Sequence, residues 1–148
     1  MQPTSHIILS GAVSGILCAA TGSPVLAATS FLAGFLIDAD HIVDYVAEYG
    51  LHFDRRFFFE SFHVGRYRKI RIVLHAWEWL AVILGIAWLT GWNDPVSGIA
   101  AGMTHHMIAD QLTNEPAPLA YFLIWRVKTR FCYRLAFPNK PWHRMPGG

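Results

Sequence analysis

The chain has 148 residues, the length of a single domain. Hydrophobic residues make up 53% of it, charged residues only 15%, and the net charge is +2, so the sequence excludes a globally basic nucleic-acid-binding protein. All 12 Lys and Arg residues nevertheless lie in two blocks, Arg55 to Arg71 and Arg126 to Arg144. Together with a mean hydropathy of +0.31, this pattern predicts an integral membrane protein.

Four apolar segments follow one another along the chain, His6 to Ala20, Pro24 to Tyr49, Ile70 to Trp92 and Pro95 to Leu112. A spanning helix needs about 20 apolar residues. The third segment satisfies this length, the second does so in its first half, and the first and fourth are short enough to need tilt or polar flanks. Leu119 to Trp125 is too short to cross, so we expect an interfacial helix followed by Arg and Lys at the lipid headgroups.

The connections between these segments alternate in character. Residues 21–24 and 91–95 are short turns, whereas residues 50–69 form a long basic loop and residues 126–148 a basic tail. Basic loops stay on the cytoplasmic side. We therefore predict an all-α fold with one membrane-embedded domain over residues 1–148. Its four short antiparallel helices and C-terminal interfacial helix would lie in the cytoplasmic (inner) membrane, with both basic segments facing the cytoplasm.

Two GxxxG motifs, Gly11 with Gly15 and Gly98 with Gly102, lie on the first and fourth predicted helices. Such pairs let two helix backbones approach closely. Glycine is also common in membrane helices without any such contact, so both interpretations remain open at this stage.

The antiparallel threading brings ionisable residues of all four helices to one face of the membrane. His106 and Asp110 are four residues apart, and His75 and Glu78 three apart, so each pair points from one side of a helix. Imidazole and carboxylate donors without a thiolate suit zinc, manganese or iron, and a hydrolytic site better than a structural zinc site. Because His105 adjoins His106, one of these two rings faces elsewhere.

Two strings of the chain resemble the signatures of a known family: Phe35-Leu36-Ile37-Asp38-Ala39-Asp40-His41 and Gly102-Met103-Thr104-His105-His106-Met107-Ile108-Ala109-Asp110. With His6 and His75, they resemble the pattern of the YdjM-like membrane-bound, predicted metal-dependent hydrolases. The resemblance covers about Ser5 to Thr113. Since that family is similar to helical zinc-dependent phospholipase C, the resemblance implies phosphoester hydrolysis at a clustered metal site. Leu74 to Trp79 departs from the family's central segment, where many members carry His-Arg and Thr-His-Ser.

We therefore expect a membrane-bound metal-dependent hydrolase that acts on a lipid-linked or headgroup phosphoester at the cytoplasmic surface. One or two divalent cations, zinc first and manganese or iron next, would be bound by His6, Asp40, His75, His106 and Asp110. Asp38 or Glu78 would serve as a further ligand or as the general base.

Other charged residues would act around this centre. His41 and Asp44 would orient the metal ligands and fix their tautomers. Guanidinium groups pair with phosphate through two parallel hydrogen bonds, so we expect the anionic substrate to be attracted by Arg55, Arg56, Arg66 and Arg68.

Two other classes of function fit parts of the same pattern. Intramembrane His, Asp and Glu residues also form relays in ion or proton conduits, although such sites usually lie near the midplane. A non-catalytic adaptor could keep a structural metal and contact anionic lipid through its basic blocks. A homodimer is possible, because four short helices bury little polar surface on their own.

Overall fold

A computed structural model describes residues 3–63 and 65–140 of the chain; residues 141–148, the end of the predicted basic tail, lie outside the described residues. The described part is all-helical, as predicted, with an isolated bridge between Lys69 and Cys132 and no strand. Its elements are α1 Pro3–Thr21, α2 Pro24–Leu36, the 3₁₀ turn η1 Ile37–Ala39, α3 Asp40–Tyr49, α4 Arg55–His63, α5 Trp77–Leu89, α6 Asp94–Thr113, α7 Leu123–Lys128 and α8 Tyr133–Ala136.

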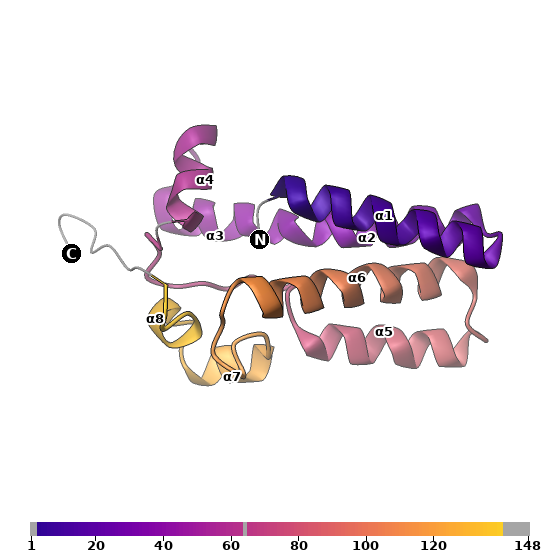
Figure 1. The fold of residues 1–148 in the computed structure, drawn as a ribbon. Coiled ribbons are helices and arrows are strands. Elements are labelled where there is room, and N and C mark those ends of the chain that lie inside the picture. Colours follow the sequence, from indigo (N-terminus) through magenta and orange to yellow (C-terminus); the bar gives the residue numbers. More distant parts are fainter. Residues whose placement is uncertain (1–2, 64, 141–148) are drawn as a thin grey trace.

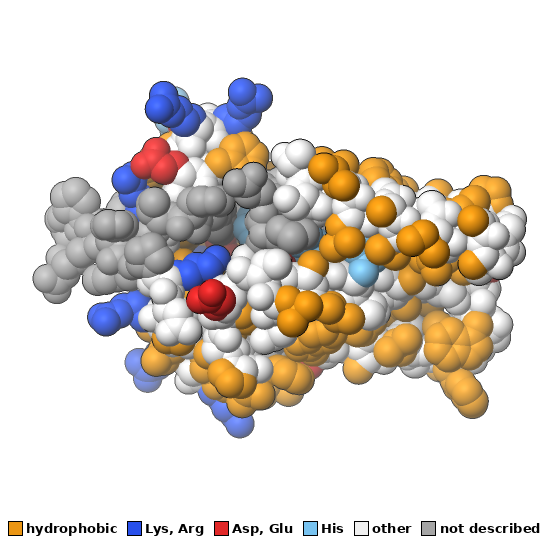
Figure 2. All heavy atoms as spheres, viewed as in Figure 1, with side chains coloured by type: hydrophobic (Ala, Val, Ile, Leu, Met, Phe, Trp, Pro, Cys, Tyr) orange, Lys and Arg blue, Asp and Glu red, His pale blue; other side chains and the backbone are white. Residues whose placement is uncertain are grey.

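Four long helices lie side by side and alternate in direction (Figure 1). α6 packs against α2, α5 and α1, and α1 packs against α2. The chain reverses at the turns that follow α1 and α5, at one end of the bundle, whereas α4, α7 and α8 gather at the other end (Figure 1). We call this second end the charged end, because the Lys, Arg, Asp and Glu side chains visible in Figure 2 lie over it.

The second predicted helix is continuous from Pro24 to Tyr49 except for the tight turn η1. It starts where the Ser23 hydroxyl accepts the N–H of Leu26 at 3.1 Å, with Pro24 in the first helical position. It ends at Gly50, whose φ of 84° lies in the left-handed region that favours glycine. A 3₁₀ turn has fewer residues per turn than an α-helix, so η1 changes which face each following side chain occupies.

The third predicted helix is shorter than expected, because helix α5 begins at Trp77 and not at Ile70. Residues 70–76 form a non-helical segment whose backbone groups are bound by side chains. The Asp44 carboxylate accepts the N–H groups of Arg71 and Ile72 at 2.8 and 2.9 Å. A helix would need those donors for its own hydrogen bonds, so these side chains stabilise the non-helical form.

Close packing through glycine is confirmed for α6 and not for α1. A Cβ atom on Gly98 would clash with Thr29 and the Leu26 carbonyl, and one on Gly102 with the Ser30 carbonyl. These two glycines therefore let the backbones of α6 and α2 approach each other. On α1, by contrast, a Cβ atom on Gly15 would meet nothing within 4 Å.

Helices α1 and α2 have an unusual distribution of polarity. Among their residues of described burial, the buried ones are polar or glycine, namely His6, Ser10, Ser14, Ser30 and Gly34. Their large apolar side chains are exposed or only partly buried; Ile8 is 68% exposed and Ile16 69%. By length and composition, Thr4–Thr21 and Pro24–Tyr49 could each cross a membrane, and Trp77–Leu89 is apolar but shorter.

The hydrophobic core lies toward the charged end, where the C-terminal segment packs on α6. Met103 and Met107 of α6 contact Tyr121, Tyr133 and other buried side chains of that cluster. The segment predicted as a loop at residues 50–69 contains α4, and the predicted interfacial helix at residues 119–125 forms later, as α7.

Candidate metal centre

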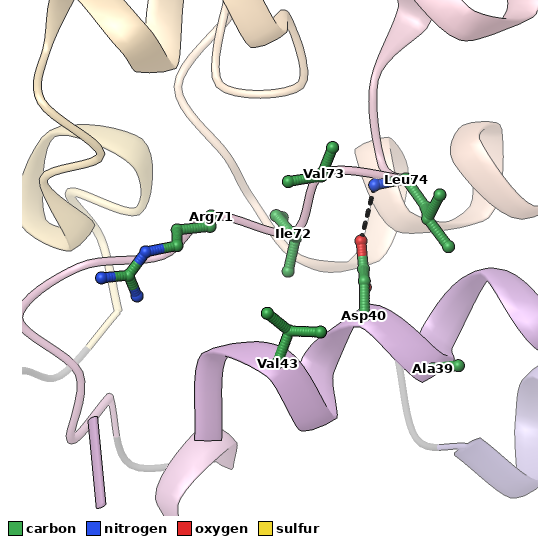
Figure 3. A pocket seen from close by; sticks show the side chains of 7 residues that line it. All are labelled: Ala39, Asp40, Val43, Arg71, Ile72, Val73 and Leu74. Carbon is green, nitrogen blue, oxygen red and sulfur yellow. Dashed lines mark hydrogen bonds between the residues drawn. The ribbon is translucent and has the colours of Figure 1, made fainter. Parts of the chain in front are cut away.

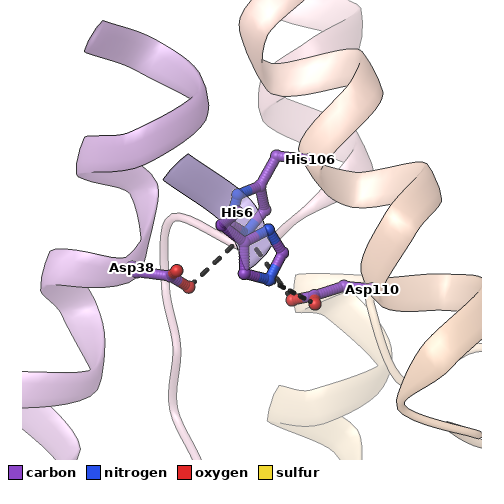
Figure 4. A group of neighbouring side chains, drawn as sticks. All are labelled: His6, Asp38, His106 and Asp110. Carbon is purple, nitrogen blue, oxygen red and sulfur yellow. Dashed lines mark ion pairs between the residues drawn. The ribbon is translucent and has the colours of Figure 1, made fainter. Parts of the chain in front are cut away.

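Side chains from four separate parts of the chain meet at the charged end of the bundle. Figure 4 shows His6 of α1, Asp38 of η1, and His106 and Asp110 of α6 pointing toward one another. His75, from the non-helical segment 70–76, joins them and is fully buried, as is His106. The structure thus brings together four of the five predicted metal ligands.

Four atoms form the centre of this cluster: Nε2 of His75, Nε2 of His106, Oδ1 of Asp38 and Oδ2 of Asp110. The two nitrogens lie 3.0 Å apart. His75 Nε2 lies 3.3 Å from Asp38 and 3.4 Å from Asp110. His106 Nε2 lies 3.4 and 3.5 Å from the same two oxygens. Five distances between 3.0 and 3.5 Å are therefore edges of a compact, roughly tetrahedral group.

The tautomers of both histidines follow from their other ring nitrogens. His106 Nδ1 lies 2.8 Å from the Gly34 carbonyl oxygen, which can only accept, so Nδ1 carries the hydrogen. His75 Nδ1 lies 3.1 Å from the Asp40 carboxylate, which also accepts the N–H of Leu74. When both rings are neutral, this arrangement turns the lone pairs of both Nε2 atoms toward the two carboxylates, as in metal-bound histidines.

This donor set fits a divalent cation. Zinc binds imidazole nitrogen and carboxylate oxygen at about 2.0–2.2 Å, which places ligand atoms of a tetrahedral site about 3.3–3.6 Å apart. The observed edges of 3.0–3.5 Å are close to these values. Four acceptor atoms facing one another in a buried space repel unless a positive charge lies between them. The buried His/Asp group can therefore hold a metal ion, and it offers no thiolate.

His6 and His41 lie beside the centre, and each packs on a different histidine of it. His6 Nε2 lies 3.0 Å from Asp110 Oδ1, and the ring stacks on His106 with 4.0 Å between centroids. His6 Nδ1 is buried and has no hydrogen-bond partner among the described residues. The ring of His41 packs on that of His75, with 4.9 Å between the centroids. Together with Asp38, these two histidines form a second group that could hold a metal ion.

Of the two carboxylates of the Asp-x-Asp-His element, Asp40 does not have the position that the sequence predicted. Asp40, expected as a metal ligand, lies behind the histidines, with His75 Nδ1 at 3.1 Å and His41 Nδ1 at 3.0 Å. Asp38, expected as a further ligand or as the general base, faces the Nε2 atoms of His75 and His106. Asp44, expected to orient the metal ligands, accepts backbone N–H groups of Arg71 and Ile72 in the segment that carries His75.

Glu78 is not part of the cluster. Its carboxylate accepts the N–H groups of Leu123 at 2.9 Å and Ile124 at 3.0 Å, so it caps the N-terminus of α7. The predicted role as general base fails because that role assumed a helix containing both His75 and Glu78, and the helix begins after His75.

Arg126 was expected at the lipid headgroups, but its side chain is buried and only 1% exposed. Its guanidinium donates to the carbonyl oxygens of Arg71, of Ile72 at 2.6 Å and of His75 at 2.7 Å. Burial lowers the pKa of Arg126, and the nearby carboxylates of Asp40, Glu78 and Asp44 oppose that shift. Arginine stays charged in proteins, so a cation holds the backbone of the His75 segment in place.

His105 faces away from the centre, which resolves the choice between the two adjacent histidines. Its Nδ1 lies 2.9 Å from the Ala101 carbonyl oxygen and its Nε2 lies 3.0 Å from the Ser10 hydroxyl. Gly34 makes room for this contact, since a Cβ atom there would lie 2.5 Å from His105 Nε2.

The four arginines expected to attract phosphate lie around α4. Arg66 pairs with Glu60 at 3.0 Å and Arg68 with Glu48 at 2.8 Å, whereas Arg55 and Arg56 are exposed. Arg71, which the sequence analysis did not single out, pairs with Asp44 at 3.5 Å.

A pocket of about 380 Å³ opens next to Asp40, between the η1–α3 junction and segment 70–76 (Figure 3). Its lining is largely apolar, and Arg71 lies at one side of it (Figure 3). It is lined by Ala39, Asp40, Val43, Arg71, Ile72, Val73 and Leu74.

Comparison of the chain with protein-family models, with curated proteins and with solved structures finds no match. The resemblance to the YdjM-like hydrolases therefore stays a prediction.

Proposed function

We propose that the protein is a membrane-bound, metal-dependent hydrolase that cleaves a phosphoester of a lipid-linked or headgroup substrate. The observation that carries this proposal is the facing pair of His75 and His106, whose Nε2 lone pairs meet two carboxylates in a buried space. Imidazole and carboxylate donors at tetrahedral spacing favour zinc, and manganese or iron are compatible with them. When bound, a divalent cation would neutralise phosphoryl oxygens and lower the pKa of a water molecule.

Asp38 is the best candidate for the residue that handles the proton of the attacking water. Its side chain is 22% exposed, whereas that of Asp110 is 3% exposed and that of Asp40 is 5% exposed. Water and substrate therefore reach the centre past Asp38. A general base must lie within hydrogen-bond reach of the proton that it removes. Asp38 would lie within that reach if His75, His106 and Asp110 held the ion and a water took its fourth position.

The substrate class follows from the surroundings of the centre. The apolar pocket beside Asp40 offers a surface for a hydrocarbon chain, and Arg71 at its side can pair with a phosphate. Val73 and Leu74, which line this pocket, are also exposed, at 41% and 45%. An amphiphile with a phosphate at one end fits this arrangement better than a fully water-soluble phosphoester does.

The reversed polarity of α1 and α2 supports insertion into a membrane. A soluble helix of this composition would bury its apolar face, whereas α1 buries His6, Ser10 and Ser14 and exposes isoleucines. Hydrocarbon around the bundle would remove that apolar surface from water. Because basic segments stay on the cytoplasmic side, we assign the charged end, and with it the centre, to the cytoplasmic face of the inner membrane.

Phosphate release by detergent-purified protein tests the activity. The substrates would be a short-chain phospholipid, a long-chain alkyl phosphate and p-nitrophenyl phosphate, each with zinc or manganese added. We expect the two amphiphiles to be cleaved, and Asp38→Asn to lower the rate by about 10²-fold or more. The exposed His52→Ala variant is the control and should keep the wild-type rate. Equal rates for wild type and Asp38→Asn, or no cleavage by metal-loaded protein, would contradict the proposal.

A further inference from the structure

Segment 70–76, which carries His75, is bonded along its length to the C-terminal unit, residues 119–137 with helices α7 and α8. Two backbone N–H groups, at the start of the segment and just after it, bind carbonyl oxygens of this unit: Ile70 that of Phe131 at 2.8 Å and Trp77 that of Tyr121 at 3.0 Å. Between them, the Arg126 guanidinium donates to the carbonyl oxygens of Ile72 and His75 at 2.6 and 2.7 Å. The position of His75 therefore depends on where the C-terminal unit lies.

Another side of the C-terminal unit, which we call its outer face, is exposed and amphiphilic. Ile124, Val127 and Lys128 lie three and four residues apart on α7, so they share one face of that helix. The two apolar side chains are 63% and 56% exposed. The outer face also includes the exposed side chains of Leu119, Phe122, Arg130, Arg134 and Leu135. Figure 2 shows hydrophobic and basic side chains next to one another at this part of the charged end, which is typical of an interaction surface.

The positive charge of the outer face is not balanced by acidic residues of the same unit. Residues 116–140 contain five Lys and Arg residues and no Asp or Glu. In α4, by contrast, Glu60 lies among the basic residues and pairs with Arg66 at 3.0 Å. Exposed apolar side chains beside Lys and Arg are typical of surfaces that lie on anionic membranes, because the apolar groups enter the acyl boundary while the cations contact phosphate.

The outer face is also close to the part of the bundle that would contact hydrocarbon. Glu78, in the first turn of α5, accepts the backbone N–H groups of Leu123 and Ile124, so α7 begins beside the start of α5. In Figure 1, α7 lies just beyond that start, at the charged end. The exposed apolar side chains of α5, among them Val82 and Ile86, would face hydrocarbon in a membrane. The outer face would then lie where hydrocarbon gives way to headgroups.

We infer that the outer face binds anionic phospholipid of the surrounding leaflet, and that this contact stabilises the C-terminal unit in the position that holds His75. This inference rests on the membrane insertion and metal binding proposed above, and it adds anionic lipid as a partner that regulates the centre. Helix α7 has only six residues and is too short to be stable alone, so its position depends on contacts on both of its sides. Lipid on the outer face therefore favours the inner contacts of Arg126.

Titration of the metal-free, detergent-purified protein with phosphatidylglycerol or phosphatidylcholine tests the lipid contact, with native mass spectrometry as the readout. Without metal, no turnover of the lipid interferes. We expect phosphatidylglycerol to bind about 5-fold tighter or more, because about 1 kcal/mol per basic side chain near an anionic surface corresponds to that factor. Lys128→Gln/Arg130→Gln should lose most of this preference. Arg55→Gln/Arg56→Gln removes the same charge from exposed positions on α4, so it is the matched control and should keep the preference.

Metal affinity in nanodiscs tests the regulation. We expect wild type to bind zinc about 5-fold tighter or more in equal parts of phosphatidylglycerol and phosphatidylcholine than in phosphatidylcholine alone. Lys128→Gln/Arg130→Gln should bind zinc equally in both lipids, and without anionic lipid it should match wild type.

Equal lipid binding by wild type and Lys128→Gln/Arg130→Gln overturns the lipid contact, and a wild-type zinc affinity that does not change with phosphatidylglycerol overturns the regulation. Both results leave the proposed function intact. Absence of zinc binding in either lipid contradicts the proposed function and with it the regulation, whereas the titration without metal still decides the lipid contact.

Discussion

Nε2 of His75 lies 3.0 Å from Nε2 of His106, and in neutral rings with the hydrogen on Nδ1 neither atom can donate to the other. The hydrogen of each ring is on Nδ1, held by the Asp40 carboxylate for His75 and by the Gly34 carbonyl for His106. Two residues 31 positions apart are thus oriented so that two lone pairs meet. A cation between these atoms would offset the cost of burying facing lone pairs and carboxylates, so the group is suited to hold a metal ion.

Asp40→Asn should weaken metal binding while it preserves the fold. An asparagine oxygen in the place of Oδ2 can still accept from Leu74 and His75, but the amide carries no negative charge and offers His41 Nδ1 an NH₂ group in place of an acceptor. Loss of such an outer partner lowers metal affinity by about 10–100-fold. Competition with a chromophoric chelator measures this change, and an unchanged affinity would contradict the orienting role of Asp40.

Arg126→Met should destabilise the protein and also weaken metal binding. The substitution leaves the carbonyl groups of Arg71, Ile72 and His75 without their donor, at a cost of about 1–3 kcal/mol for each group that stays buried and unsatisfied. Thermal unfolding in detergent and chelator competition measure the two effects.

Arg126→Lys keeps the charge and some of the hydrogen bonds, so it should recover part of the metal affinity. Lys128→Met, at an exposed position on the same helix, is the matched control and should behave as wild type. Metal affinity that stays constant across the Arg126 variants would show that Arg126 serves stability alone.

Gly98→Ala should lower the unfolding temperature in detergent, because the added methyl group would clash with Thr29 and with the Leu26 backbone. Overpacking of this kind costs about 1–3 kcal/mol. Gly85→Ala is the control on α5, where a Cβ atom meets nothing within 4 Å. It should be neutral or stabilising by up to about 1 kcal/mol. Equal effects of both substitutions would contradict the close approach of α6 to α2.

Much of the centre was predictable from sequence because it depends on helix alternation. Hydrophobic segments and turn lengths alone predicted that His6, His75, His106 and Asp110 would meet at one end, and they do. The i,i+4 spacing of His106 and Asp110 also placed both on the same face of α6.

The position of Asp40 behind the histidines, with Asp38 facing their Nε2 atoms, could not be predicted in the same way. It depends on η1, a 3₁₀ turn inside an otherwise continuous apolar helix, and no Pro or Gly marks this turn in the sequence. An uninterrupted α-helix would have given each carboxylate a different direction.

The burial of Arg126 could not be predicted from local sequence either. An arginine that follows a short apolar stretch fits a headgroup contact and a buried contact equally well. Its carbonyl partners lie 51 to 55 positions earlier in the chain, so only the tertiary fold distinguishes the two. The non-helical segment 70–76 was missed for the same reason, since its backbone is held by Asp44 and Arg126 and not by local propensity.

The proposed orientation can be tested with single cysteines in a background without Cys18 and Cys132. Arg56→Cys, at an exposed position on α4, should react with a membrane-impermeant maleimide only after the cells are permeabilised. Ala20→Cys, exposed at the opposite end of the bundle, should react in intact cells. The reverse pattern would place the centre on the other face, and labelling of both positions in intact cells would exclude a spanning arrangement.

The central claim is that the buried His/Asp cluster binds a divalent cation, and the metal content of purified His106→Ala tests it most directly. His105→Ala is the matched control, since it removes the adjacent imidazole, which bonds to Ser10 and Ala101 and not to the cluster. We predict that wild type and His105→Ala bind zinc or manganese and that folded His106→Ala loses most of it. Negligible metal in all three proteins, even after zinc or manganese is added, would contradict the claim and favour a conduit or an adaptor without a metal.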